Sequence, residues 1–171
     1  MDITNCDWSS KISMAKYFFS GRFLYCFKLA EKWAPEAIQS ATEGLSREQT
    51  DLPQLPISCA SEVAKKMGAS DEEMVIAAGF AGGLGLSGNA CGALSAAIWM
   101  NTLAWCRKVG VKKSAMSNPN AKQTLEAFYG ATENEILCHK ITGQSFKTIA
   151  DHTDFIKNGG CDKLINVLAR S

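Results

Sequence analysis

Apolar residues recur at helical spacing along most of the chain, for example at Ala60, Val63 and Met67. Ser58 stands where it can cap the start of that helix, and Gly68 stands where helices commonly end. No segment shows the alternation of apolar and polar residues that marks a half-buried strand. The pattern predicts an all-α fold, a compact bundle of about six to eight helices.

Other helix starts carry their own capping patterns. The pairs are Ser70 with Glu73, Asn118 with Pro119, and Thr132 with Glu135, the last of them ahead of Cys138. The helix that follows Asn118 is expected to end before Gly130. A last helix is expected around Leu164 and Leu168, after the turn at residues 158–160.

The stretch from Met74 to Cys106 contains no charged residue and is long enough to raise the question of a membrane span. Glycines recur within it, so a lipid-exposed helix would be interrupted at its centre. We therefore predict a short helix, a glycine-rich loop and then a buried central helix that runs from near Ala90 to about Arg107.

The amino-terminal part of the chain is rich in aromatic residues. Residues 11–33 contain Tyr17, Phe18, Phe19, Phe23, Tyr25, Phe27 and Trp33. Gly21 predicts a break, and Pro35 and Gly44 are typical of the first residue and the end of a short helix over residues 35–43. We expect these helices to cover the core or a second subunit, and the alternative is an interfacial membrane helix.

A linker separates this aromatic part from the rest. The stretch at residues 51–56 contains two prolines and breaks the helical periodicity. The sequence therefore predicts an aromatic-rich helical arm at residues 1–52 and a helical domain at residues 53–171.

Composition narrows the classes of function. The chain has 18 basic and 17 acidic residues, so no strong overall field attracts nucleic acid, and no nucleic-acid partner is expected. Residues 1–5 lack the basic and apolar pattern of a secretory signal, which favours a cytoplasmic protein. In a reducing compartment, seven cysteines favour metal binding or thiol chemistry over a disulfide framework.

Several cysteines fall at predicted helix starts: Cys59 follows Ser58, Cys91 follows the glycine loop, and Cys161 follows two glycines. A helix amino terminus presents unpaired N–H groups and partial positive charge, which lower the pKa of a thiol. We therefore expect Cys91 to be the most reactive or most strongly ligating cysteine, although burial in a dry pocket would act in the opposite direction.

The glycine loop at residues 79–88 lacks the ending of a phosphate-binding loop and leads directly to a cysteine. Its glycines let backbone amides approach a sulfur or whatever the sulfur binds. We expect this role for the backbone of Gly82, Gly83, Gly85 and Gly88.

The glycine loop and four cysteines carry a family resemblance. The run at residues 79–85, followed by Cys91-Gly92-Ala93, with Cys59-Ala60 upstream and Cys138 and Cys161 downstream, resembles the C_GCAxxG_C_C redox-active proteins over residues 57–169. The resemblance implies that Cys59, Cys91, Cys138 and Cys161 are the shared cysteines and that the function is redox, with no assigned substrate. The last glycine of the family pattern is Ala96 in this chain.

The family is more distantly similar to part of the split-Soret cytochromes c, which are dimeric and carry haem and an iron–sulfur centre. This chain has no C-x-x-C-H sequence, so no c-type haem is expected. Four thiolates can hold an iron–sulfur cluster or another metal, with His139 or His152 as a substitute ligand or proton donor. The cysteine spacings lack the paired knuckles of structural zinc sites.

These observations lead to two hypotheses of function. The first is a redox or electron-transfer protein, expected to be a homodimer, that uses the four cysteines as a metal or iron–sulfur centre or as a thiol–disulfide centre. Its electron donor or acceptor is unknown, and whether it is an enzyme stays open. The second is a non-catalytic membrane-associated or transporter-partner protein. This second hypothesis, with its membrane contact, is the less favoured one. Cys6, Cys26 and Cys106 are expected to be inert.

Overall fold

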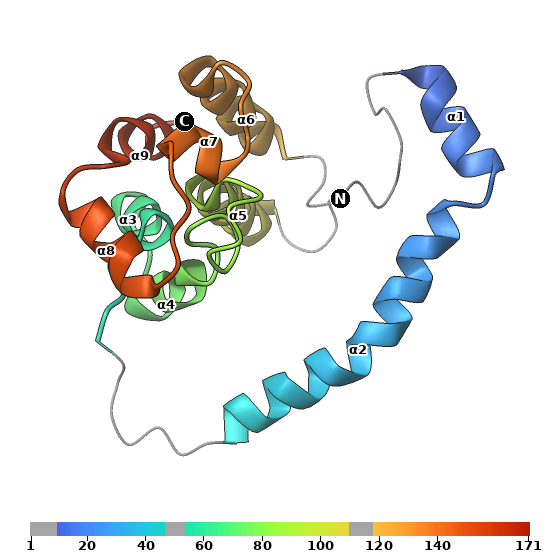
Figure 1. The fold of residues 1–171 in the computed structure, drawn as a ribbon, viewed down its shortest axis with the longest axis horizontal. Helices are drawn as coiled ribbons and strands as arrows, with labels where there is room; N and C mark the ends of the chain where they lie inside the picture. Colours follow the sequence, from blue (N-terminus) through green and yellow to red (C-terminus); the bar gives the residue numbers. More distant parts are fainter. Residues whose placement is uncertain (1–9, 47–53, 110–117) are drawn as a thin grey trace. The chain divides into compact units, whose positions relative to one another are not determined.

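The computed structural model describes residues 10–46, 54–109 and 118–171, and these residues form helices without any strand, which confirms the all-α prediction. Contacts divide the chain into two units, Met1–Leu52 and Pro53–Ser171 (Figure 1).

Unit 1 contains the helices α1 (Lys11–Phe19) and α2 (Phe23–Ser46), and Gly21, with a φ of 70°, lies at the predicted break between them. The short helix predicted to start at Pro35 and to end at Gly44 is wrong, because α2 continues through both residues. Proline inside a helix costs about 3 kcal/mol. Strong helix formers such as alanine, glutamate and lysine surround Pro35 and favour one continuous helix.

Unit 2 is a bundle built around α3. Its helices are α3 (Cys59–Lys66), α4 (Asp71–Ala78), α5 (Gly92–Val109), α6 (Pro119–Thr132), α7 (Cys138–Thr142), α8 (Ile149–Lys157) and α9 (Asp162–Leu168). Helix α3 packs against α4, α5 and α9, and α6 packs against α5 and α9 (Figure 1). Fully buried alanines, including Ala60 of α3 and Ala96 of α5, let these backbones approach closely. The added methyl group of Ala96 therefore lies inside the core.

Most of the predicted helix starts are confirmed. Ser58 caps α3, Ser70 and Glu73 form the capping box of α4, and Asn118 caps α6. A further capping box, formed by Thr148 and Asp151 at the start of α8, was not predicted.

The capping box predicted at Thr132 and Glu135 is wrong. Thr132 is the last residue of α6, which passes Gly130, and the Thr132 hydroxyl donates to the Phe128 carbonyl inside that helix. The Glu135 carboxylate instead accepts hydrogen bonds from the two N–H groups that directly follow it, of Ile136 and Leu137. The Glu135 carboxylate therefore binds backbone N–H groups just before the start of α7, and Glu135 itself lies outside that helix.

The uncharged stretch forms α4, a tight loop and α5, as predicted. A side chain at Gly92 would collide with the Phe80 carbonyl oxygen, and one at Gly83 would lie 2.7 Å from the Ala90 carbonyl oxygen. Glycine is therefore required where the loop passes over the start of α5. Within the described residues, no helix is both long and apolar enough to cross a membrane.

Candidate functional site

All four candidate cysteines lie at the amino end of a helix. Cys59 is the first residue of α3, Cys91 directly precedes α5, Cys138 is the first residue of α7, and Cys161 is the N-cap of α9. The sequence predicted this position for three of them. It missed Cys138 because the helix start was assigned to Thr132.

The four cysteines line one small cavity of about 10 Å³. Cys59, Cys91 and Cys138 are buried, and Cys161 is half-buried. After burial, which is the largest cause, the pKa of Cys59 is raised by the neighbouring sulfurs of Cys161, Cys91 and Cys138. The sulfurs of Cys91 and Cys138 likewise raise the pKa of Cys161, and the sulfur of Cys138 raises that of Cys91. Every pair of the four thiols therefore interacts across the cavity.

Burial is the main influence on these thiols. It raises the pKa of Cys59 and of Cys161 to about 12, raises the pKa of Cys91 to about 11, and also raises the pKa of Cys138. An ordinary thiol has a pKa of 9.0. The four thiols are therefore protonated at neutral pH when they bind nothing.

The expectation that Cys91 has a lowered pKa is wrong. Backbone N–H groups of Leu94 and Ala93 do lower the pKa of the Cys91 thiol, as a helix start should. Desolvation outweighs them because the sulfur is enclosed by packed helices, and the cost of a charge in a dry site is large.

The four loop glycines that were expected to surround the centre, Gly82, Gly83, Gly85 and Gly88, have different roles. The N–H of Gly82 lies close enough to the Cys59 sulfur to lower its pKa in part. Gly83 lies against the backbone of Gly88, and Gly85 donates its N–H to the Gly79 carbonyl at 3.1 Å and lies further along the loop surface. Of these four glycines, Gly82 is therefore the one whose N–H reaches a cysteine sulfur among the described contacts.

The two histidines lie in different places. The Nδ1 atom of His139 is 2.8 Å from the Gly88 carbonyl oxygen, and the backbone N–H of His139 donates to the same oxygen, so this residue holds α7 against the glycine loop. His152 of α8 lines the cysteine cavity instead. It is 2% exposed, its ring meets Phe146 edge-on at 4.9 Å, and burial lowers its pKa.

Four cysteine sulfurs suit a single tetrahedral metal ion by their chemistry. The cavity has room for about one water-sized body. An iron–sulfur cluster, with several iron and sulfide atoms, does not fit unless the walls move outward. Within the described residues, no three His, Cys, Asp or Glu side chains are spaced to hold a metal ion as they stand.

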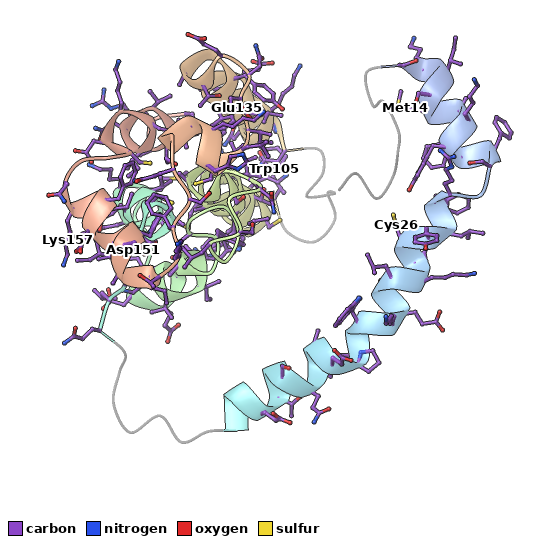
Figure 2. All side chains as sticks on the ribbon, viewed as in Figure 1. Met14, Cys26, Trp105, Glu135, Asp151 and Lys157 are labelled. Atoms are coloured by element: carbon purple, nitrogen blue, oxygen red, sulfur yellow. The ribbon has the colours of Figure 1, made fainter. Side chains whose placement is uncertain are left out.

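Of the remaining cysteines, the structure describes Cys26 and Cys106, and neither is among the residues that line this cavity. Cys26 is exposed on α2, in unit 1, with its sulfur 3.3 Å from the Tyr17 hydroxyl (Figure 2). Cys106 is half-buried in α5. Cys6 lies outside the described residues.

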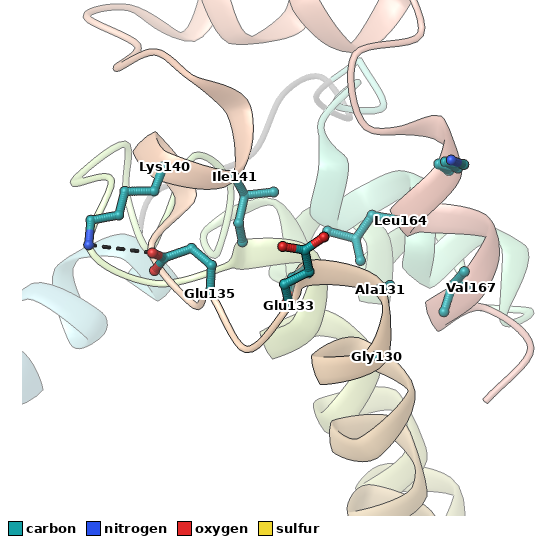
Figure 3. Close-up of a pocket in the computed structure, with 10 residues that line it drawn as sticks. Gly130, Ala131, Glu133, Glu135, Lys140, Ile141, Leu164 and Val167 are labelled. Atoms are coloured by element: carbon teal, nitrogen blue, oxygen red, sulfur yellow. Dashed lines mark ion pairs between the residues drawn. The ribbon is translucent and has the colours of Figure 1, made fainter.

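Two larger hollows adjoin the cysteine cavity. The first, the α6–α9 pocket, shares Ile141 and Leu164 with it and contains the Glu135–Lys140 ion pair at 3.4 Å (Figure 3). The second, the α8 groove, shares His152 with it. The α8 groove is lined by Gln54, Leu55, Pro56, Ile57, Ser58, Ala78, Gly79, Ala81, Gly85, Leu86, Ile149, His152, Thr153 and Lys157.

One comparison with known proteins gives a match. The model of a family described as "Putative redox-active protein (C_GCAxxG_C_C)" matches residues 57–171, which is more than half of the chain. No curated protein and no solved structure matches it.

Proposed function

Because this chain belongs to the C_GCAxxG_C_C family of redox-active proteins, we propose that Cys59, Cys91, Cys138 and Cys161 together form its redox centre. The observation that carries the proposal is that four helix starts bring four interacting thiols to one cavity. A scattered set of core cysteines would not interact in every pairing.

The chemistry that the cavity favours is reversible oxidation of two thiols to a disulfide. The reaction releases two protons and two electrons and removes two of the four S–H groups from the cavity. The raised thiol pKa values mean that no thiolate stabilises the reduced form at neutral pH. Stabilised thiolates make a disulfide strongly oxidising, so we expect the opposite here, a reducing couple with a low potential.

Redox titration tests this proposal. The protein is equilibrated with dithiothreitol buffers of graded potential, trapped with iodoacetamide, and the free thiols are located by mass spectrometry. We expect a two-electron transition confined to the four cavity cysteines, which persists when Cys26 and Cys106 are both replaced by serine. If the four cavity thiols stay reduced in the most oxidising buffer while the protein remains folded, the proposal fails.

A metal centre held by the same cysteines is the second candidate, and one observation favours it. The four cysteines lie at the amino ends of four helices, and the partial positive charge of a helix amino end stabilises the net negative charge of a metal bound by four thiolates. Metal binding would displace the four thiol protons, so affinity should rise with pH.

Anaerobic purification separates the candidates. Visible absorbance with stoichiometric iron supports an iron–sulfur centre, stoichiometric colourless metal supports a single ion, and metal-free protein with an active thiol couple supports the disulfide proposal. Metal-free, redox-silent protein that pellets with liposomes would favour the membrane-associated alternative.

A further inference from the structure

The α8 groove has the size and lining of a small-molecule site. Its volume is about 580 Å³, within the range of ligand pockets. Three of its apolar side chains are exposed, Leu55 at 46%, Ile57 at 39% and Ile149 at 76%. Exposed apolar side chains gathered around one hollow are a feature of binding sites.

The groove and the cysteine cavity are separated by a single layer of residues. Ser58 lines the groove and the next residue, Cys59, lines the cavity. Ala81 lines the groove and the next residue, Gly82, directs its N–H at the Cys59 sulfur. The His152 side chain faces both spaces, and it makes no side-chain hydrogen bond to a described residue that would hold the ring in place.

The charge in the groove indicates what it binds. Among the described residues of its lining, Lys157 at the end of α8 is the charged side chain, and the lining includes no carboxylate. An apolar lining with one ammonium group suits an apolar molecule that ends in an acid.

The α6–α9 pocket has a similar volume but a different character. It contains two glutamates and two lysines, and the Glu135–Lys140 pair already satisfies part of this charge. Its common wall with the cysteine cavity consists of the bulky side chains of Ile141 and Leu164. The pocket therefore carries charges of both signs, and bulky side chains separate it from the cysteine cavity. Substitutions in this pocket serve as matched controls for those in the α8 groove.

We propose that the α8 groove is the substrate site of the cysteine centre and that its substrate is an apolar disulfide with an acidic end. This inference rests on the proposed thiol–disulfide function. The acid pairs with Lys157, the apolar body lies against Ile57 and Ile149, and the disulfide meets Cys59 when the His152 ring turns aside.

The reaction balances without a further oxidant. The Cys59 thiol loses its proton, its sulfur attacks one sulfur of the substrate, the substrate S–S bond breaks, and the released sulfur takes up a proton. A second cavity thiol then loses its proton and attacks Cys59, which forms the protein disulfide and releases the other substrate sulfur, again with a proton. Two protein thiols are oxidised and one substrate disulfide is reduced to two thiols.

Binding is tested apart from redox chemistry with octanoate, an apolar acid without a disulfide. Calorimetry of the reduced, metal-free full chain should show binding that weakens up to about fivefold in Lys157→Ala, as for a partly exposed ion pair. The Ile149→Asp variant should weaken it by about tenfold or more, because it removes apolar contact and adds repulsion. Ile149 is an exposed first residue of α8, where an acid stabilises the helix, so the variant should keep the wild-type circular dichroism spectrum. Lys163→Ala, in the α6–α9 pocket, should bind octanoate as the wild type does.

Reaction is tested with lipoate, an apolar acid that contains a disulfide, by trapping the cavity thiols over time. Lys157→Ala should slow their oxidation in proportion to its loss of affinity. His152→Ala should speed it several-fold at saturating lipoate, where a change in affinity no longer affects the rate. Octanoate binding that is absent, or equally sensitive to Lys163→Ala, overturns the groove proposal even if the thiols titrate in dithiothreitol. If His152→Ala protein still binds octanoate but its thiols are oxidised more slowly than those of the wild type, or at the same rate, the proposed route from the α8 groove past the His152 ring to Cys59 is wrong. Normal octanoate binding with no thiol oxidation by lipoate or by buffer overturns the thiol–disulfide function instead.

Discussion

Raising the pH from about 8 to about 10 should destabilise unit 2 through its buried thiols. Burial holds the pKa of Cys59 at about 12 and that of Cys91 at about 11, whereas an ordinary thiol has a pKa of 9.0. Above pH 9.0 the unfolded chain loses these protons and the folded chain keeps them. The unfolded state then binds fewer protons, so the free energy of unfolding falls as the pH rises from 9.0 toward 11 or 12.

The size of this effect follows from the two pKa values. A thiol with a pKa of 9.0 when unfolded and a much higher pKa when folded costs roughly 1 to 2 kcal/mol of stability at about pH 10. Cys59 and Cys91 together therefore account for a loss of about 3 kcal/mol, a large part of the stability of a small domain.

Urea unfolding followed by circular dichroism measures this loss in reduced, metal-free protein kept without oxygen. Other groups also titrate in this range, so the readout is the difference between the wild type and a Cys59→Ala, Cys91→Ala double variant. The double variant starts less stable but should lose about 3 kcal/mol less between the two pH values. Cys26→Ala, which removes a thiol from unit 1, should follow the wild type. Parallel curves for the wild type and the double variant would refute the assignment of raised pKa values.

The other predictions concern the loop, its contact with α7, and the assembly. Gly92→Ala should cost several kcal/mol in urea unfolding because its methyl group meets the Phe80 carbonyl oxygen, whereas Gly130→Ala, with open space in α6, should stabilise by about 0.5–1 kcal/mol; equal effects would contradict the clash. His139→Ala should cost about 1 kcal/mol by the same assay, because it removes the ring contact with the Gly88 carbonyl oxygen. A cost near zero would show that this contact does not hold the loop. Light scattering of the full chain at micromolar concentration should give the mass of a dimer, because α2 exposes several aromatic side chains, and a monomeric mass would count against it.

Much of the helix arrangement could be predicted from the sequence because capping acts over a few residues. Ser58 and Ser70 accept hydrogen bonds from N–H groups three residues on, so the residue types and their spacing suffice to locate α3 and α4. The glycines inside the uncharged stretch likewise excluded a single helix over residues 74–106. Local rules failed where two local outcomes compete. Thr132 can cap a helix or bond back into one, and the sequence does not distinguish the two.

The cysteine pattern was likewise readable from the sequence, since the order of four cysteines around a glycine motif needs no coordinates. Which histidine lies beside the sulfurs was decided only by the packing of α8, because His139 is next to Cys138 in the sequence but turns to Gly88, whereas His152 is distant in the sequence and lines the cavity. The direction of the thiol pKa shifts was likewise decided only by the tertiary structure. The helix start supplies amides from the next few residues, and these are visible in the sequence, but desolvation depends on every helix packed around the sulfur, and only the folded chain brings those together.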